Sequence, residues 1–301
     1  MENFLSLKGC FPPISTPFDR KGNVAFDKLA GNLEWWQKNT PLAGFAVLGS
    51  NGESPYLTEA EKIETFKAAR AAIRKDRLFI AGTGCESTLA TIELTEKAGK
   101  IGADAALVVT PHYFKGKMDH EALINHYVSL ADRSPIPIIL YNVPNFTGID
   151  MSPETIIECA QHPNVLGCKE SSGNVVKIAT VASATPERFQ VLAGSGSFLL
   201  PAILMGAVGG IMAVAALAAA LLDEMIRSFE KGDLHRAKEI QVKLIPLNNA
   251  VTSRFGVAGL KYAMDLVGLY GGPVRSPLRE LTSQQKGLLK DMLVGSGFFE
   301  L

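Results

Sequence analysis

The chain has 301 residues, 47% of them hydrophobic, and its 30 basic and 30 acidic residues give a formal net charge of zero. A chain of this length can bury a large core, either as one α/β barrel or as two smaller domains. The balanced charge argues against nucleic acid or an anionic membrane surface as a partner, and it favours a small-molecule ligand.

The cysteines and the N-terminus favour a cytoplasmic protein. Cys10, Cys85, Cys159 and Cys168 are scattered without a CxxC pair, which is more typical of reduced thiols than of disulfides or a zinc framework. Residues 1–8 contain no basic segment followed by an apolar one, so we expect no cleaved signal peptide. The uncharged stretch 189–222 is interrupted by Pro201 and several glycines, so we expect a buried barrel wall there and not a membrane span.

Eight short apolar segments are predicted as strands. They are 9–14, 44–48, 78–81, 105–109, 136–141, 165–169, 189–193 and 210–214. Helical patterns separate them: Thr58 opens a capping box before a helix through Ala72, and Ser152-Pro153 starts another helix. Repeated strand–helix units over about the first 230 residues predict an α/β fold, a (β/α)8 TIM barrel with a C-terminal helical extension. An open doubly wound sheet is the alternative, but it would normally show a glycine-rich phosphate turn after its first strand.

The C-terminal part is predicted to be helical. We expect residues 1–232 to form the barrel and residues 233–301 to form an appendage packed on it, because no flexible linker separates the two. Asp233 is a predicted helix cap, and Pro246 is expected to end that helix near Leu244. Two further helices are predicted at 258–267 and 284–293, and Thr282 caps the second.

A lysine ends the sixth predicted strand. An apolar run stops at Lys169, and the polar sequence Glu-Ser-Ser-Gly follows. Alternation places Val165, Gly167 and Lys169 on one face, with Gly167 leaving space beneath the ammonium group. Burial disfavours a charged amine, and a neutral amine can attack a ketone to form an imine. On these residues alone, a lysine that only caps the strand at the surface is the better interpretation.

Other polar residues follow neighbouring strands, where a TIM barrel carries its active site. Tyr141 ends the fifth predicted strand at the level of Lys169, and its phenol can donate or accept a proton, although tyrosine is also common in strands for packing. In the loop 49–53, glycines allow backbone N–H groups to converge on a carboxylate, and Ser50 and Asn51 add side-chain donors. An ordinary turn is the alternative.

Metal and nucleotide sites are not predicted. His120 and His126 are six residues apart, which separates them around a helix, and the other three histidines are isolated. Neither Gly82-Thr83-Gly84 nor Gly194-Ser195-Gly196 is followed by the third glycine of a dinucleotide motif. We therefore expect no metal and no cofactor, with an imine on Lys169 as the electron sink.

Five motifs together resemble the dihydrodipicolinate synthase and N-acetylneuraminate lyase superfamily over nearly the whole chain. They are GSNGESPYLT at 49–58, VVTPHYF at 108–114, YNVPNFTG at 141–148, GCKESSG at 167–173 and FQVLAGSGSFL at 189–199. Within this superfamily the chain is most similar to the 4-hydroxy-2-oxoglutarate aldolases, through GSNGE, SPIPIILYNVP and the C-terminal segment that contains RFGVAGLK and YGGP.

The resemblance implies a class I aldolase or lyase that depends on pyruvate and works without a metal. The family is usually a dimer of dimers, so a homotetramer is also implied. The implied residue roles are a Schiff base on Lys169, proton relay by Tyr141, carboxylate binding by Ser50 and Asn51, substrate contacts from Ser171 and Gly194, and insertion of Tyr113 into a neighbouring subunit's site.

One residue departs from the synthase pattern. Dihydrodipicolinate synthases carry an arginine in YNVPxR that holds the carboxylate of the second substrate, and this chain has Phe146 there. Losing this bidentate donor favours cleavage of 4-hydroxy-2-oxoglutarate, or a similar 4-hydroxy-2-oxo acid, to pyruvate and an aldehyde such as glyoxylate. The alternatives are condensation of pyruvate with aspartate semialdehyde, cleavage of 2-keto-3-deoxy sugar acids, and a catalytically silent barrel that acts as a binding or scaffold protein.

Overall fold

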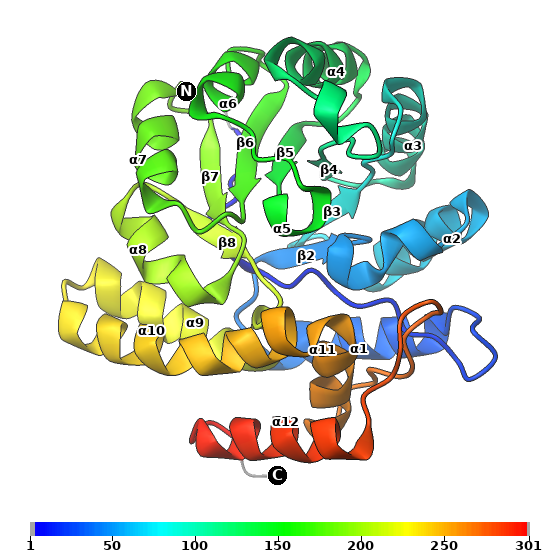
Figure 1. Ribbon diagram of the computed structural model, residues 1–301, viewed down its shortest axis with the longest axis vertical. Coiled ribbons are helices and arrows are strands. Elements are labelled where there is room, and N and C mark those ends of the chain that lie inside the picture. The colour runs from blue at the N-terminus through cyan, green and yellow to red at the C-terminus, as the bar shows by residue number, and fades with distance from the viewer. Residues whose placement is uncertain (1–3, 300–301) are drawn as a thin grey trace.

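The computed structural model describes residues 4–299. Its parallel strands form one sheet in the order β1-β8-β7-β6-β5-β4-β3-β2. The strands are β1 Gly9–Phe11, β2 Gly44–Val47, β3 Leu78–Gly82, β4 Ala105–Val109, β5 Ile138–Asn142, β6 Val165–Glu170, β7 Gln190–Ala193 and β8 Gly209–Ile211. The two ends of this order meet at a bridge between Pro13 and Ala46, where Ile14 N–H donates to the Ala46 carbonyl over 2.9 Å. The sheet therefore curves into the predicted TIM barrel (Figure 1).

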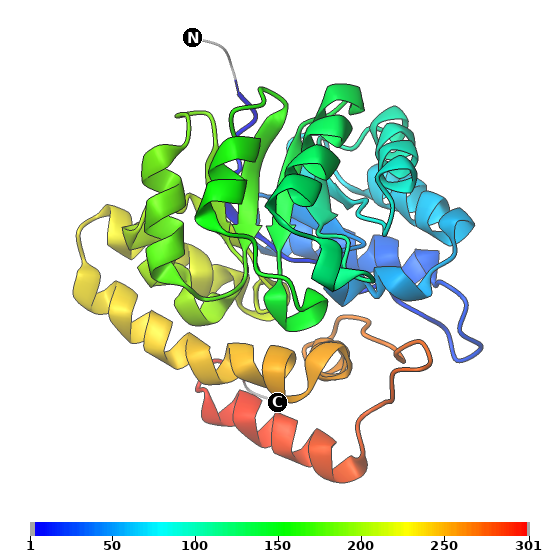
Figure 2. The same cartoon turned by 45° about the horizontal axis from the view of Figure 1, so that its top comes forward.

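Helices cover the outside of this sheet, and Figures 1 and 2 show the helices of the C-terminal extension along one side of the barrel. The covering helices are α1 Phe26–Asn39, α2 Glu59–Ala72, α3 Thr88–Ile101, α4 His120–Arg133, α6 Pro153–Cys159, α7 Val175–Ala184, α8 Leu199–Leu204 and α9 Ala215–Glu230. The short α5 Pro144–Thr147 lies in the loop that follows β5. The extension contains α10 Leu234–Asn249, α11 Gly256–Leu266 and α12 Ser283–Gly295. The predicted helical extension is thus confirmed, and the capping boxes at Thr58 and Thr282 both form.

Two hydrophobic cores lie on opposite faces of the sheet. The inner core fills the barrel with alternate strand side chains: Phe11, Ala46, Ile80, Leu107, Ile139, Leu192 and Ile211. The outer core joins the other face to the helices, for example through Phe45, Phe79 and Val191. Strands covered on both faces explain why their sequences are almost continuously apolar.

The first strand is shorter than predicted. It ends at Phe11, whereas the apolar pattern extends to Ile14. The next two residues, Pro12 and Pro13, have no N–H groups and cannot donate to a ladder. The chain continues only as the isolated bridge that closes the barrel.

The predicted end of the first extension helix is wrong. α10 passes through Pro246 to Asn249 and leads into a π-helical turn, Ala250–Arg254. A proline inside a helix removes one hydrogen bond, but buried Leu244 and Leu247 hold the helix against the rest of the protein on both sides of it. Tertiary packing therefore overrides the local signal.

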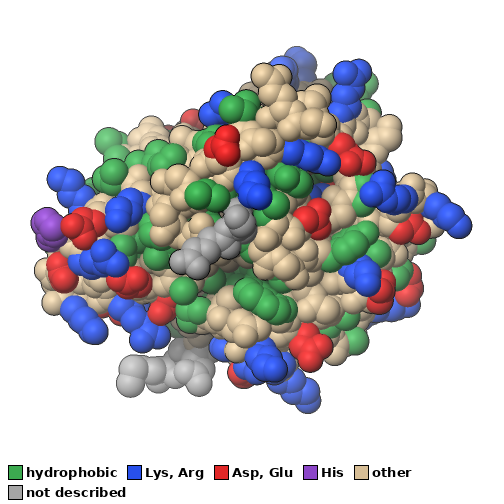
Figure 3. Space-filling view, turned by 90° about the horizontal axis from the view of Figure 1, so that it is seen from below, with side chains coloured by type: hydrophobic (Ala, Val, Ile, Leu, Met, Phe, Trp, Pro, Cys, Tyr) green, Lys and Arg blue, Asp and Glu red, His purple; other side chains and the backbone are tan. Residues whose placement is uncertain are grey.

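The outer surface agrees with the balanced composition. On the face shown in Figure 3, basic and acidic side chains are interspersed and hydrophobic side chains form small separate groups. Within residues 4–299, every helix is too short or too polar to cross a membrane.

Candidate active site

Lys169 and Tyr141 are direct partners on adjacent strands. They pair across β5 and β6, and the Lys169 Nζ lies 3.9 Å from the centroid of the Tyr141 ring. Only 3% of Lys169 and 5% of Tyr141 is exposed. Within residues 4–299, Lys169 forms no ion pair with a carboxylate, so its amine is free to act as a nucleophile. This excludes the interpretation of Lys169 as a solvated strand cap.

The strand that carries Lys169 is irregular. Its register with β5 shifts between the pairs Ile138–Val165 and Ile139–Gly167. Val165 consequently belongs to the outer core, so the prediction that it shares a face with Lys169 is wrong. A bulge of this kind re-aims the side chains that follow it.

Gly167 serves close strand packing. A Cβ at this position would lie 2.1 Å from the carbonyl oxygen of Gln190 on β7. The glycine is required because the neighbouring backbone leaves no room for a side chain. The prediction that Gly167 leaves space beneath the ammonium group of Lys169 stays a prediction.

The loop after β2 contributes a hydroxyl to the end of the barrel where Lys169 and Tyr141 lie. Ser50–Gly52 form a single 3-10 turn, and the Ser50 Oγ lies 3.3 Å from the Tyr141 hydroxyl, close enough to share a hydrogen bond. The side-chain nitrogen of Asn51 is buried and has no hydrogen-bond partner among the described residues. A buried donor without a partner is costly, so this amide is suited to a polar ligand.

Ser171 and Gly194 meet where β6 and β7 end. The Gly194 N–H donates to the Glu170 carbonyl over 2.7 Å. A Cβ at Gly194 would lie only 1.9 Å from the Ser171 Oγ. This hydroxyl is also buried without a hydrogen-bond partner in the part of the chain that the structure describes. The predicted residues at these two strand ends are therefore adjacent.

A buried polar cluster behind the strand ends was missed in the sequence. The Asn142 amide donates to Glu170 over 2.8 Å and to Asp150 over 2.7 Å, and the Lys177 ammonium pairs with both carboxylates. Since Asn142 and Glu170 directly follow Tyr141 and Lys169, the cluster fixes the ends of both strands. The sequence could have indicated this cluster, because a polar residue directly follows each of the two predicted site residues.

Tyr113 lies apart from this group in the single chain. It is 78% exposed and its ring packs edge-on against Phe114, with 5.0 Å between the centroids. Its N–H and that of His112 donate to the Glu86 carboxylate over 2.8 and 2.9 Å, which holds the loop. The structure describes no contact from Tyr113 to Lys169, Tyr141 or Ser50.

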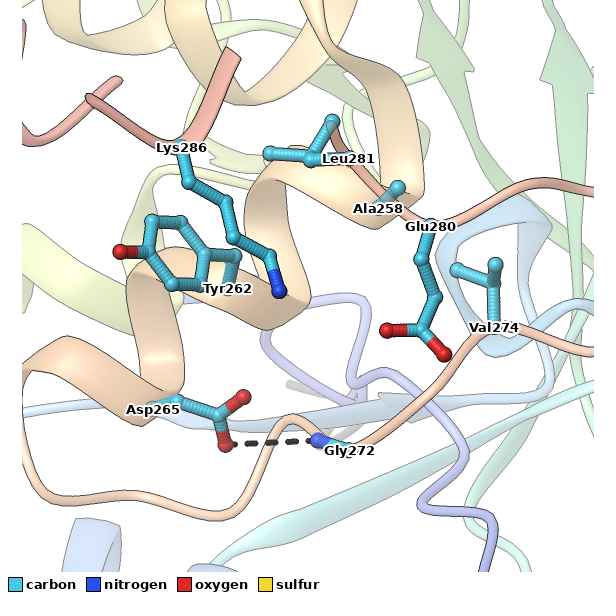
Figure 4. Close-up of a pocket in the computed structure, with 8 residues that line it drawn as sticks. All are labelled: Ala258, Tyr262, Asp265, Gly272, Val274, Glu280, Leu281 and Lys286. Atoms are coloured by element: carbon cyan, nitrogen blue, oxygen red, sulfur yellow. Dashed lines mark hydrogen bonds between the residues drawn. The ribbon is translucent and has the colours of Figure 1, made fainter. Parts of the chain in front are cut away.

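The histidines do not gather into a site. His126 is buried, with its Nδ1 2.9 Å from the Thr88 hydroxyl, and burial lowers its pKa from 6.5 to about 4. Within residues 4–299 no group of three or more His, Cys, Asp or Glu residues could hold a metal ion. The pocket in Figure 4 is separate from these residues, because α11, the segment between α11 and α12, and Lys286 of α12 line it.

Comparison with known proteins places these features in a family. The dihydrodipicolinate synthetase family matches residues 6–294. A 4-hydroxy-tetrahydrodipicolinate synthase from Thermoanaerobacter sp. (strain X514) is 35% identical over 295 residues, covering 98% of both chains. The corresponding synthase from Methanothrix thermoacetophila is 33% identical over 288 residues, covering 95% of this chain and 96% of the relative.

Solved structures agree with the fold. A dihydrodipicolinate synthase from Bacillus anthracis superposes with a TM-score of 0.93 at 29% identity, covering 99% of this chain and all of that chain. The synthase from Acinetobacter baumannii complexed with pyruvate gives a TM-score of 0.92 at 31% identity, covering 98% of this chain and 100% of that one.

The TIM barrel and its strand-end lysine define a carbon–carbon lyase of the class I aldolase type. The chain belongs to the dihydrodipicolinate synthetase family. The relatives described above are synthases by name, so they support the superfamily resemblance and not the narrower similarity to 4-hydroxy-2-oxoglutarate aldolases.

Proposed function

We propose that this enzyme cleaves a 4-hydroxy-2-oxo acid, with 4-hydroxy-2-oxoglutarate as the expected substrate, through a Schiff base on Lys169. The observation that carries the chemistry is the buried contact between Lys169 and Tyr141. A buried amine beside a phenol provides both a group that can form an imine and a proton relay.

The reaction follows from this pair. The Lys169 amine attacks C2 of the substrate, and loss of water leaves a protonated imine. Tyr141, hydrogen-bonded to Ser50, first gives its own proton to the C2 hydroxyl that leaves as water, and it then takes the proton of the C4 hydroxyl. The C3–C4 bond then breaks, its electrons neutralise the iminium as an enamine, and glyoxylate leaves. Protonation at C3 and hydrolysis release pyruvate and restore the amine.

The turn after β2 is assigned to the substrate's C1 carboxylate. Ser50 and Asn51 present a hydroxyl and a buried amide at this turn. Ser171 and the turn that begins at Gly194 are assigned to the distal end. Neutral donors can hold a carboxylate well where water is excluded.

Phe146 supports cleavage as the reaction. It lies on α5 directly after β5, and 68% of it is exposed, so an apolar ring occupies the position of the synthase arginine. Loss of a charge-assisted bidentate contact weakens binding of the aspartate semialdehyde carboxylate.

Condensation of pyruvate with aspartate semialdehyde is the second candidate, and the names of the relatives support it. A cation also reaches this region: the Lys115 side chain packs against Gly148 at the end of α5, with its Nζ 3.6 Å from where a Cβ would stand. Lys115 is therefore an available partner for a distal carboxylate in either reaction.

Borohydride trapping tests the shared chemistry. The protein is incubated with pyruvate and borohydride near neutral pH, and its intact mass and peptides are measured. We expect a stable adduct on Lys169 in the wild type and none in Lys169→Met. Absence of an adduct in the wild type would support the silent-barrel alternative and reject both imine mechanisms.

The choice of substrate requires a kinetic comparison. We expect kcat/KM for cleavage of 4-hydroxy-2-oxoglutarate to exceed that for pyruvate plus aspartate semialdehyde, and a higher value for condensation would reverse the assignment. Cleavage of 2-keto-3-deoxy sugar acids belongs in the same comparison. Phe146→Arg should raise condensation relative to cleavage, and Lys115→Met shows whether that cation serves either substrate.

We also propose that the active form is a cytoplasmic homotetramer in which Tyr113 completes a neighbouring subunit's site. The exposure of Tyr113 and Phe114, two adjacent aromatic rings on one loop, supports such a contact. Exposed aromatic side chains are enriched at protein interfaces.

A further inference from the structure

We propose that a buried ion pair between Glu53 and Lys261 positions the Ser50–Gly52 turn, so that the C-terminal extension controls the carboxylate-binding side of the active site. The inference rests on the proposed function, because it assumes that this turn binds the substrate carboxylate. Glu53 and Lys261 act here as positioning residues, since they contact the turn and the extension and not the substrate.

The backbone of Glu53 forms the end of this turn. Its N–H donates to the Ser50 carbonyl over 3.1 Å, and its own carbonyl accepts from Tyr56 over 2.8 Å. The residue has a φ of 55° in the left-handed region, which is unfavourable for a residue with a side chain. Surrounding contacts must therefore hold Glu53 in this conformation.

The Glu53 side chain provides these contacts. It is buried, with one carboxylate oxygen 2.5 Å from the Lys261 Nζ on α11. The other oxygen accepts the Arg275 N–H over 2.8 Å. A charge that is 1% exposed is stable only with such partners, so moving the carboxylate would leave it unpaired in the core.

Lys261 is fixed just as firmly. It is 1% exposed, donates to the Pro273 carbonyl over 2.8 Å, and lies 4.4 Å from the centroid of the Phe18 ring. Burial lowers the pKa of Lys261, although the neighbouring Glu53 carboxylate opposes this effect. A lysine held in this way offers a rigid anchor for the turn.

The segment after α11 supplies the remaining partners because it folds back tightly. The Asp265 carboxylate accepts the N–H groups of Gly271 and Gly272 over 2.7 and 3.3 Å, and Figure 4 shows the second of these bonds. A Cβ at Gly271 would lie 1.8 Å from the Lys261 carbonyl, so this close approach requires glycine. The fold-back brings Pro273 and Arg275 to the ion pair.

A second ion pair fastens the segment that follows the turn. The Arg275 guanidinium donates to both Glu61 oxygens over 2.7 and 2.8 Å, and it also donates to the Tyr56 carbonyl over 2.9 Å. The Arg275 side chain lowers the Glu61 pKa to about 2. The extension thus holds the chain at residues 53, 56 and 61.

These contacts bear on the site because Ser50 is only three residues before Glu53. The Ser50 Oγ lies 3.3 Å from the Tyr141 hydroxyl, at the turn assigned to the substrate carboxylate. The Thr16 hydroxyl holds the Gly52 carbonyl from the barrel side over 2.6 Å. The Glu53–Lys261 pair holds the turn from the extension side.

The test measures pyruvate binding separately from the chemical step. Borohydride trapping is followed over a range of pyruvate concentrations in the wild type and in Lys261→Met, which removes the cation while keeping a similar volume. We expect the half-saturating pyruvate concentration to rise about 10- to 100-fold, as expected for a misplaced binding group, while the trapping rate at saturation changes little. The double variant Glu53→Gln/Lys261→Met should recover part of this loss, because no unpaired charge remains buried.

A matched control separates positioning from stability. Leu289→Ala removes buried apolar contacts from α12 in the same extension, and it should lower the melting temperature without changing half-saturation. If Leu289→Ala raises the half-saturating pyruvate concentration as much as Lys261→Met does, or if Lys261→Met leaves this concentration unchanged, the inference is wrong.

A substitute variant covers the case in which Lys261→Met does not fold. Glu53→Gln then takes its place, because a buried lysine can lose its proton when its partner becomes neutral. A wild type that forms no adduct refutes the proposed function and this inference together, whereas a trapped wild type with unaltered variants refutes the inference alone.

Discussion

The strand ends and the loops of this active site are positioned by different means. Lys169 and Tyr141 lie on adjacent strands, and the backbone ladder between β5 and β6 places them opposite each other. Ser50 and Tyr113 lie on loops, where no ladder fixes them. Glu53, three residues after Ser50, contacts the distant extension, and Tyr113 is 78% exposed.

In the proposed mechanism, the residues on strands carry out the chemical step, and the residues on loops bind the substrate or the neighbouring subunit. The bonds that break and form involve groups on the rigid sheet, whereas the substrate carboxylate and the neighbouring subunit meet groups on loops. Catalytic groups on strands are held more accurately than groups on loops. Variants at strand ends should therefore affect the chemical step, and variants in the Ser50 loop should mainly affect binding. Tyr113 is the exception among the loop residues, because its hydroxyl is proposed to reach the reacting centre of a neighbouring subunit.

The largest effect among the following variants is expected from Tyr141→Phe. The ring and its contact with Lys169 remain, but the hydroxyl near Ser50 is lost. Loss of a positioned acid or base typically costs about 10²- to 10⁴-fold, so turnover should fall on this scale while the fold is kept. Steady-state kinetics and circular dichroism provide the measurement. Turnover close to that of the wild type would show that Tyr141 is a packing residue.

A smaller loss is expected from Gly194→Ala, where the new methyl group would collide with the Ser171 hydroxyl. Overpacking of this kind costs about 1–3 kcal/mol and should displace both residues, which lowers kcat/KM by roughly 10- to 100-fold. Gly31→Ala is the control, because the exposed face of α1 leaves open space at that position. If Gly194→Ala keeps a normal kcat/KM, the predicted substrate contacts of Ser171 and Gly194 are wrong.

Tyr113→Phe should lower turnover by about 10-fold, as expected for one lost hydrogen bond at the reacting centre. Sedimentation combined with activity measurements tests the underlying assembly, and dissociation should reduce activity while each barrel stays folded. Tyr262→Phe, in the extension, is the control. A fully active monomer would reject the shared site but not the lyase assignment.

No loss of turnover is expected from His126→Gln, because His126 belongs neither to the site residues at the strand ends nor to those on the loops. Its effect should appear in stability. Its pKa is lowered from 6.5 to about 4 by burial, so between these pH values the unfolded chain binds a proton that the folded chain does not. The wild type should lose up to about 3 kcal/mol of unfolding free energy relative to the variant as pH falls from 7 to 4. Urea unfolding at several pH values checks this, with the exposed His235→Gln as control, and parallel pH profiles would contradict it.

Much of the site was predictable because its signals are local. A buried strand that stops at a lysine, a neighbouring strand that ends at a tyrosine, and helix caps at Thr58 and Thr282 all depend on residues close in sequence. Parallel strands in a barrel bring their carboxyl ends to one edge, so the strand pattern alone placed Lys169 beside Tyr141.

The tertiary structure decided the features that depend on distant or bulky neighbours. The passage of α10 through Pro246 and the need for glycine at 167 result from packing against other elements, and the β6 bulge appears only in the pairing of β6 with β5. The Glu53–Lys261 pair joins residues that are far apart in the sequence, and a glutamate after a glycine turn does not reveal its partner. Local propensities determine where strands and helices form, whereas burial decides which charges must meet, because only a buried charge requires a fixed partner.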